Sequence, residues 1–148
     1  MFSRLRTRRT WLAGVACLPL LLGARFVRST DVPVPDRVWY DAALAMLREA
    51  ESWGDQPYGA VLVLDGTLVG EGPSRVVKNR DVDAHAEREA IKDAQRRLGR
   101  TDLSGAILYS TSRPCRLCER AAAKARISRL YFGSALTDAG APRQDAGT

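Results

Sequence analysis

The sequence predicts an α/β protein, a three-layer α/β/α sandwich in which helices cover a mixed sheet. Three segments carry helix signals, either apolar residues at three- and four-residue spacing or a proline at a suitable helix start. Four short apolar segments lie between them and have the length of buried strands. The order is helix, strand, strand, helix, strand, helix, strand, and such an order is typical of layered α/β folds.

The first half of this pattern is a helix followed by a hairpin. Apolar residues recur at three- and four-residue steps through residues 36–53, as in an amphipathic helix. Two apolar runs, residues 59–64 and 67–70, then flank Asp65 and Gly66. An Asp-Gly pair suits the two positive φ angles of a type I′ turn, so the two runs are predicted to form a β-hairpin.

The second half alternates helices with single strands. A second amphipathic stripe predicts a helix over residues 83–98, with Asp83 as its N-cap. A buried strand is expected at residues 106–111, a helix from Pro114 to about residue 126, and a last strand at residues 128–133.

A single domain is expected to account for the body of the chain. Its 148 residues can bury a core, and the contents of 45% hydrophobic and 27% charged residues are ordinary for a globular protein. The domain is predicted at residues 31–140, with a polar loop at 72–82 and a flexible tail at 141–148. The net charge of +6 comes from six arginines within residues 1–30, because 17 basic and 17 acidic side chains remain after them. Bulk charge therefore favours no polyanionic partner.

Residues 1–30 are predicted to be a signal peptide and a linker. An Arg-rich start precedes an apolar run at residues 11–23, which is shorter than an ordinary membrane span. The Arg8-Arg9 pair and the large apolar residues after it resemble the twin-arginine export signal of bacteria. We therefore expect an exported, periplasmic protein with no membrane span after cleavage of the leader. An uncleaved leader would instead tether the protein to the membrane.

Two short motifs carry the candidate chemistry. The first contains His85 and Glu87, and the second is a Cys-x-x-Cys pair, Cys115 and Cys118. One imidazole and two thiolates are a common protein ligand set for a catalytic zinc ion, whose fourth position stays open for water. Both cysteines lie on one helix face, and the amide groups at the helix start are expected to lower the pKa of their thiols. Glu87 is well placed to handle the proton of the water.

Other roles for these residues fit the pattern less well. A Cys-x-x-Cys pair alone can be a redox centre, as in thioredoxin-like proteins, but that role leaves His85 and Glu87 unexplained. A structural zinc ion normally has four protein ligands, whereas the domain supplies three, because Cys17 lies in the leader. Glu87 can also be a surface residue paired with Arg88, but its spacing from His85 favours the catalytic role.

The H-x-E and P-C-x-x-C motifs resemble the signature of zinc-dependent nucleobase deaminases, the cytidine/deoxycytidylate deaminase superfamily. The resemblance covers residues 38–140 and is closest to the branch of tRNA adenosine deaminases and guanine deaminases. Residues 59–63 and 70–72 before the first motif, and residues 126–133 after the second, are also similar to that branch.

This resemblance implies a cytidine deaminase-like fold and a role for each motif residue. His85, Cys115 and Cys118 are expected to bind Zn2+. Glu87 is expected to be the catalytic general acid and base, which carries a proton from the zinc-bound water to the ring nitrogen and then to the departing ammonia.

Three departures from the family pattern bear on specificity. Arg113 stands before Pro-Cys, where close relatives usually have Glu. Ser74 stands where relatives commonly have an Asn that contacts the substrate. The chain also stops soon after Gly133, so a shortened carboxyl end is expected, without the last strand and helix of longer relatives.

These observations predict a zinc-dependent hydrolytic deaminase of a nucleobase, nucleoside or related amino-heterocycle, which releases ammonia. One alternative is a catalytically silent zinc-binding module, which the three departures motivate; another is a tRNA adenosine deaminase-like RNA editor. A small-molecule substrate is favoured over nucleic acid, because the basic helix face of Arg116, Arg120 and Lys124 is more simply a solvated surface. The resemblance also suggests a homodimer.

Overall fold

The computed structural model describes residues 35–145, which contain four helices and five strands. The helices are α1 (Arg37–Ser52), α2 (Val76–Asn79), α3 (Ala86–Leu98) and α4 (Arg116–Lys124). The strands are β1 (Gly59–Leu64), β2 (Thr67–Pro73), β3 (Ile107–Ser110), β4 (Arg129–Phe132) and β5 (Thr137–Gly140).

The five strands form one mixed sheet in the order β2-β1-β3-β4-β5. Strand β1 is antiparallel to both β2 and β3, whereas β3 and β4 run parallel and are connected through α4. Strand β5 adds to the outer edge of β4 in the antiparallel direction. Both kinds of pairing are present, so the predicted mixed sheet is confirmed.

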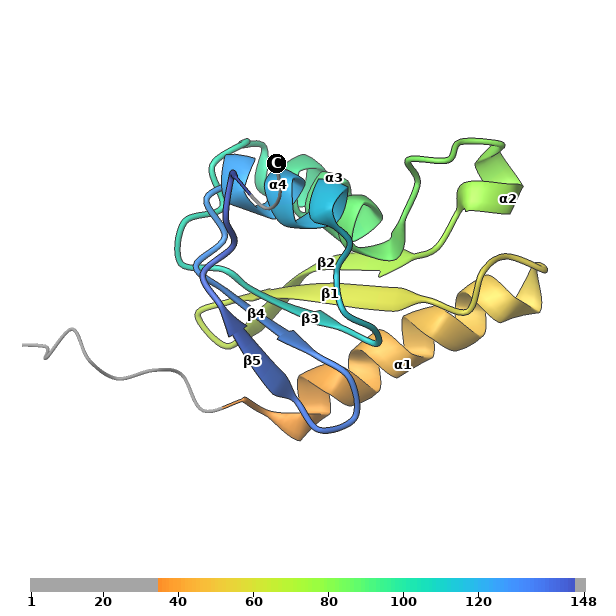
Figure 1. Cartoon of the computed structure of the whole chain (residues 1–148), viewed down its shortest axis with the longest axis horizontal. Coiled ribbons are helices and arrows are strands. Elements are labelled where there is room, and N and C mark those ends of the chain that lie inside the picture. The colour runs from red at the N-terminus through yellow and green to blue at the C-terminus, as the bar shows by residue number, and fades with distance from the viewer. Residues whose placement is uncertain (1–34, 146–148) are drawn as a thin grey trace, which may run out of the picture. The chain divides into compact units, whose positions relative to one another are not determined.

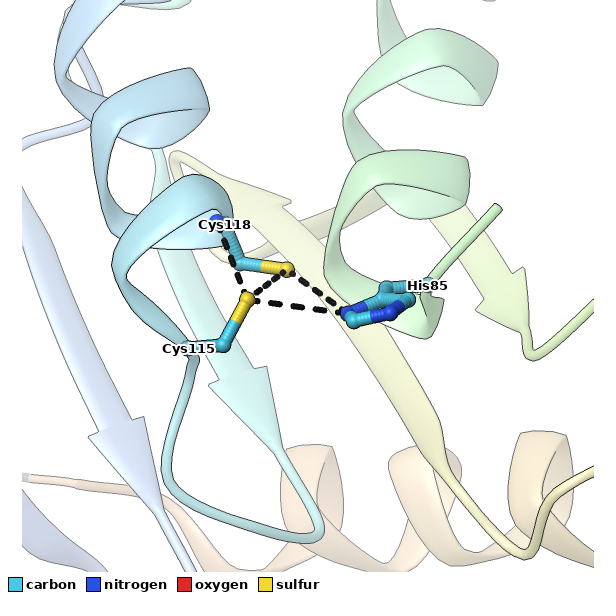
Figure 2. Close-up of side chains that lie close together, drawn as sticks. All are labelled: His85, Cys115 and Cys118. Carbon is cyan, nitrogen blue, oxygen red and sulfur yellow. Dashed lines mark hydrogen bonds between the residues drawn. The ribbon is translucent and has the colours of Figure 1, made fainter. Parts of the chain in front are cut away.

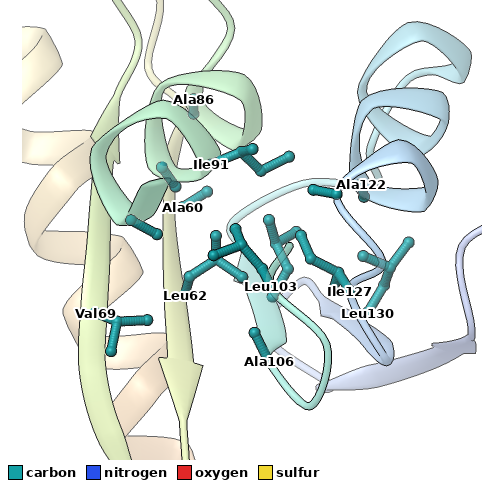
Figure 3. Close-up of a cluster of buried hydrophobic side chains, with 14 residues drawn as sticks. Ala60, Leu62, Val69, Ala86, Ile91, Leu103, Ala106, Ala122, Ile127 and Leu130 are labelled. Atoms are coloured by element: carbon teal, nitrogen blue, oxygen red, sulfur yellow. The ribbon is translucent and has the colours of Figure 1, made fainter. Parts of the chain in front are cut away.

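Helices cover the two faces of this sheet, with α1 on one side and α3 and α4 on the other (Figure 1). Successive strand residues point to opposite faces. Leu62, Leu108 and Leu130 therefore pack beneath α3 and α4, in the cluster that Figure 3 shows. Their neighbours Val61 and Tyr109 pack with α1 instead. The structure is the predicted three-layer α/β/α sandwich, with one core on each face of the sheet.

The predicted hairpin is present, with the predicted turn. Asp65 and Gly66 have φ angles of 49° and 71°, so both turn residues are left-handed, as a type I′ turn requires. The register of the β1–β2 pair shifts by one residue, because Leu62 pairs with Gly70 and Val63 with Leu68, so Val69 of β2 forms a bulge.

Two elements were not expected from the sequence. Helix α2 lies within the predicted polar loop at 72–82, and strand β5 follows the segment predicted as the last strand. Asp55 stabilises α2 from a distance, because its Oδ2 accepts hydrogen bonds from the backbone N–H groups of Val77 and Lys78. Strand β5 is mostly exposed and has no apolar pattern, so it depends on its pairing with β4.

Helix α3 lies unusually close to β2. A methyl group on Gly72 would come within 2.0 Å of the backbone oxygen of Ala86, and one on Gly70 within 2.4 Å of that of Ala90. The missing side chains allow the helix backbone to lie directly on the strand. This contact fixes the first turn of α3, where the first motif is located.

The predicted signal peptide and linker at residues 1–30 lie outside the described residues, as does the end of the predicted tail. The described part of that tail contacts α4, because Arg143 donates to Glu119 and Arg120 donates to the backbone of Gln144. No helix among residues 35–145 is long and apolar enough to cross a bilayer.

Candidate metal centre and pocket

The structure brings together the three side chains predicted to bind metal. The ligand atoms of His85, Cys115 and Cys118 lie within 4.8 Å of one another, although His85 is 30 residues or more from the cysteines (Figure 2). Nδ1 of His85 is 3.6 Å from Sγ of Cys115 and 3.5 Å from Sγ of Cys118. The two sulfur atoms are 3.3 Å apart, much farther than the ~2.05 Å of a disulfide bond.

These distances fit a tetrahedral zinc ion. Bonds of about 2.3 Å to sulfur and about 2.0–2.1 Å to nitrogen, at tetrahedral angles, place nitrogen roughly 3.5 Å from sulfur. Both distances from Nδ1 of His85 agree with this value, and the sulfur–sulfur distance is shorter than the roughly 3.8 Å of the same geometry. Residues 35–145 supply three ligands to this group, which would leave the fourth position open, as in catalytic rather than structural sites. The described residues thus contain a group suited to Zn2+.

Each ligand segment begins a helix. His85 is the N-cap of α3, with φ −67° and ψ 152°, and Cys115 is the N-cap of α4, with φ −70° and ψ 166°. Both helices therefore begin slightly later than predicted. The N-cap of α3 is His85 and not Asp83, and the first residue of α4 is Arg116 and not Pro114. The extended backbone at His85 and Cys115 places each residue at the N-terminal end of its helix. Figure 2 shows that the two side chains point toward each other. The backbone N–H of Cys118 donates to Sγ of Cys115, which caps α4.

The thiol of Cys118 does not have the lowered pKa that its place at a helix start predicts. Burial raises the pKa of the Cys118 thiol, and the neighbouring carboxylate of Glu87 and the sulfur of Cys115 raise it further. These groups outweigh the helix amides. A cation at the site reverses the balance, because it offsets the negative charge and holds the sulfur as a thiolate.

Glu87 is buried beside the ligands. Its side chain is 5% exposed, and Oε1 accepts a 3.0 Å hydrogen bond from the hydroxyl of Ser110, the last residue of β3. A buried carboxylate needs such a partner, since burial without one is costly. Glu87 is therefore held in one orientation and is not the exposed helix residue of the simpler interpretation. The sequence had singled out Glu87 but not Ser110, for which the only signal is a polar residue ending a buried strand.

A cavity of about 260 Å³ opens beside the candidate metal ligands. His85, Glu87 and Cys115 contribute to its wall, and the remaining lining comes from Gln56, Tyr58, Ala86, Ser112 and Arg113. Gln56 and Tyr58, which follow α1, were not predicted to line the site, because their segment contains no motif.

The two departures within the described residues lie in different surroundings. Arg113 is exposed and lines the cavity. Ser74 is fully buried, does not line the cavity, and donates its hydroxyl to Oδ1 of Asp55. Ser74 therefore supports the fold around Asp55, and its side chain has no place in the pocket wall.

The sheet, the ligand group and the adjacent carboxylate define a zinc-binding α/β protein. Residues 34–134 match the family model of the cytidine and deoxycytidylate deaminase zinc-binding region. The chain belongs to this family.

Among curated proteins, the chain is 44% identical over 94 residues to the tRNA-specific adenosine deaminase of Agrobacterium fabrum (strain C58 / ATCC 33970). It is 40% identical over 83 residues to the guanine deaminase of Bacillus subtilis (strain 168). These matches cover 64% and 56% of this chain, and they span only 62% and 53% of the relatives' lengths.

Solved structures give the same picture. A structure from studies of A-to-I editing by tRNA:A34 deaminases matches with a TM-score of 0.64 and 42% identity, over 66% of this chain and 71% of that one. The guanine deaminase of Bacillus subtilis matches with a TM-score of 0.64 and 33% identity, over 68% of this chain and 64% of that one. The structure from the tRNA:A34 deaminase studies and the guanine deaminase structure therefore share this fold.

Proposed function

We propose that this protein is a zinc-dependent hydrolytic deaminase that acts on a nucleobase, nucleoside or related amino-heterocycle and releases ammonia. The observation that carries the proposal is the convergence of His85, Cys115 and Cys118 beside the buried carboxylate of Glu87, at the wall of one cavity. Family membership and similarity to adenosine and guanine deaminases support it.

The side chains divide the reaction between them. Nδ1 of His85 and the sulfurs of Cys115 and Cys118 would hold a zinc ion, which lowers the pKa of a water molecule to about 7 and so supplies the nucleophile. Glu87 accepts one proton of the water and delivers it to the ring nitrogen. Once the oxygen has added to the ring carbon, Glu87 takes the remaining hydroxyl proton and gives it to the departing amine. A C–O bond forms at the amino-bearing carbon, the C–N bond breaks, and ammonia leaves. Ser110 keeps the carboxylate oriented throughout.

The cavity favours one heterocycle as the reacting group. Its volume of about 260 Å³ lies below the 300–1,000 Å³ of typical drug-sized ligand sites. Tyr58, which is 43% exposed, contributes an aromatic side chain to the wall, and aromatic rings stack on heterocycles. These dimensions suit a single base as the part of the substrate that enters the cavity.

Ammonia release tests the proposal. We expect the zinc-loaded protein to release ammonia from at least one member of a panel of guanine, adenine, cytosine and their nucleosides and nucleotides. Glu87→Gln should bind one zinc ion per chain and lose about 10²–10⁴-fold in kcat. Tyr40→Phe, on α1 away from the pocket lining, is the control and should retain activity. If the wild type binds one zinc ion but releases no ammonia from any compound of the panel, the result would instead favour the catalytically silent binding module.

A tRNA substrate is the second candidate, because a relative 44% identical to this chain is a tRNA-specific adenosine deaminase. It predicts inosine formation in a tRNA pool and binding that weakens steeply with added salt, since phosphate contacts release counterions. Conversion of free bases or nucleosides with no tRNA deamination would exclude it.

We further propose that residues 1–30 direct export to the periplasm. Support comes from the arginine pair and the short apolar run. Fractionation of cells that express the full chain should find it in the periplasm, whereas a variant with both Arg8→Lys and Arg9→Lys should stay inside the cell. Wild-type protein in the cytoplasmic or membrane fraction would contradict cleavage and release.

A homodimer likewise stays a prediction, which sedimentation of the zinc-loaded protein can test.

A further inference from the structure

Arg113 is the cation of the pocket wall. It lies on the loop between β3 and α4, two residues before the ligand Cys115. The other charged side chain of the lining that is not a metal ligand is Glu87, which is already hydrogen-bonded to Ser110. Within residues 35–145, the aromatic ring of Phe132, 6.0 Å from the guanidinium carbon, is the partner found for Arg113, and no carboxylate pairs with it.

Arg113 balances the negative charge of Glu87 at the site. A zinc ion with two thiolates is formally neutral, so Glu87 alone would leave the pocket negative and would repel an anionic substrate. Arg113 offsets that charge. Its exposed guanidinium can still form new hydrogen bonds, since a contact with an aromatic ring leaves the N–H donors at the edge of the group available.

Arg113 also lines a second cavity next to the pocket. A cavity of about 180 Å³ lies between α4, β4 and β5, and Arg113 lines both cavities. The acidic side chains of this second cavity are paired, Glu119 with Arg143 and Asp138 with Arg129. A substrate group that passes from the first cavity along Arg113 into the second therefore meets no unpaired carboxylate there.

We propose that the substrate is a nucleotide, whose base enters the cavity beside Glu87 and whose phosphate binds Arg113. The guanidinium fork binds phosphate with two parallel hydrogen bonds, which a neutral base or nucleoside cannot form. This inference rests on the proposed function for its base-binding half, whereas the phosphate contact is measurable by binding alone.

Direct binding to the zinc-loaded protein is the first test. Adenosine, guanosine and cytidine would be titrated beside their 5′-monophosphates, with inorganic phosphate as a competitor. For the base that binds, we expect the monophosphate to bind about 10- to 100-fold more tightly than the nucleoside. Arg113→Ala should remove this preference, and Arg113→Glu should reverse it. Arg143→Ala removes an arginine of the second cavity that is already paired, and it should leave the preference intact.

The outcomes separate the two proposals. Equal affinity for nucleoside and monophosphate, or a preference that survives in Arg113→Ala, would overturn the nucleotide inference even if ammonia is released. A preference that depends on Arg113 without ammonia release would support the inference and reject the deaminase. Binding of a tRNA pool more tightly than any monophosphate, with loss in Arg113→Ala, would assign the guanidinium to RNA and also overturn the inference. Unchanged zinc content in each variant excludes an indirect effect on the metal.

Discussion

The hydroxyl of Ser110 donates a 3.0 Å hydrogen bond to Oε1 of Glu87, and both side chains are buried. Ser110 ends β3, whereas Glu87 lies in the first turn of α3. The bond therefore connects the sheet directly to the proposed proton-transfer group. It makes Ser110 a positioning residue, which acts through the carboxylate.

Loss of this hydrogen bond should slow the reaction without loss of metal. Hydrogen bonds to charged groups contribute about 1.5–3 kcal/mol, so we expect Ser110→Ala to lower kcat by roughly 10-fold or more, with KM little changed. Ser110→Thr keeps the hydroxyl and should restore most of the rate, although its extra methyl group lowers stability. Steady-state kinetics and zinc analysis would check this. Full activity of Ser110→Ala would reduce the hydroxyl to a structural role.

Removal of one ligand should abolish the response of the fold to zinc. A ligand present at 1,000 times its Kd stabilises the native state by about 4 kcal/mol, which in a domain of this size raises Tm by on the order of 10–20 °C. We expect that rise in the wild type and its absence in Cys118→Ser or after chelation. Leu117→Ser changes an exposed neighbour on α4 and should keep the full response. Stabilisation of Cys118→Ser by zinc equal to that of the wild type would refute the ligand assignment.

The close contact between β2 and α3 makes Gly72 a sensitive position. A methyl group there would lie 2.0 Å from the backbone oxygen of Ala86, so Gly72→Ala must displace the first turn of α3. Overpacking of this kind costs about 1–3 kcal/mol or more, and the shift should also weaken zinc binding through His85. Gly99→Ala is the control: its φ of 63° adds about 1–2 kcal/mol of strain, but no atom lies within 4 Å. Urea unfolding and zinc titration should show a loss of zinc affinity for Gly72→Ala alone.

Asp55 should make stability depend on acidic pH. Burial opposes its ionisation, but hydrogen bonds from the backbone of Lys78 and Gln56, the hydroxyl of Ser74 and the backbone of Val77 together lower its pKa below the ordinary 3.8. The carboxylate therefore stabilises the fold fully above about pH 4, and this contribution is lost as the pH falls through the lowered pKa.

The variant Asp55→Asn tests this dependence. It should unfold more easily than the wild type at pH 7, by about 1–3 kcal/mol, and the difference should shrink towards pH 3. Urea unfolding at both pH values measures it. Asp102→Asn is the control at an exposed position. Asp102 also has a lowered pKa, in its case from hydrogen bonds with Ser104, but solvent screens its charge, so this variant should differ less from the wild type at both pH values. A difference between Asp55→Asn and wild type that is constant with pH would contradict the role of the charge.

Local patterns in the sequence predicted most of the fold. The hairpin follows from Asp65 and Gly66, and α1 and α3 follow from their apolar stripes, because these signals lie within the elements themselves. Helix α2 has no such signal: Asp55 caps it from more than 20 residues earlier in the chain. Strand β5 likewise exists because the edge of β4 is available to it. Contacts between distant segments are not visible in local patterns.

The candidate site divides in the same way. His85, Glu87, Cys115 and Cys118 were identifiable because their chemistry and spacing are specific. Gln56 and Tyr58 were not, since they reach the pocket only through the position that the α1–β1 connection takes in the folded chain. Residue type identifies the reacting groups, whereas the pocket wall depends on the folded chain.

The parallel pair β3 and β4 has a consequence for the tolerance of insertions. Parallel neighbours require a crossover, and here the crossover contains α4 and both cysteines. Extra residues between Ser110 and Cys115 would move the sulfurs away from His85, whereas extra residues in the exposed hairpin turn at Asp65 and Gly66 would lengthen only a surface loop. Length variation among natural or designed versions of this chain should therefore concentrate in the hairpin and leave the β3–α4 connection constant.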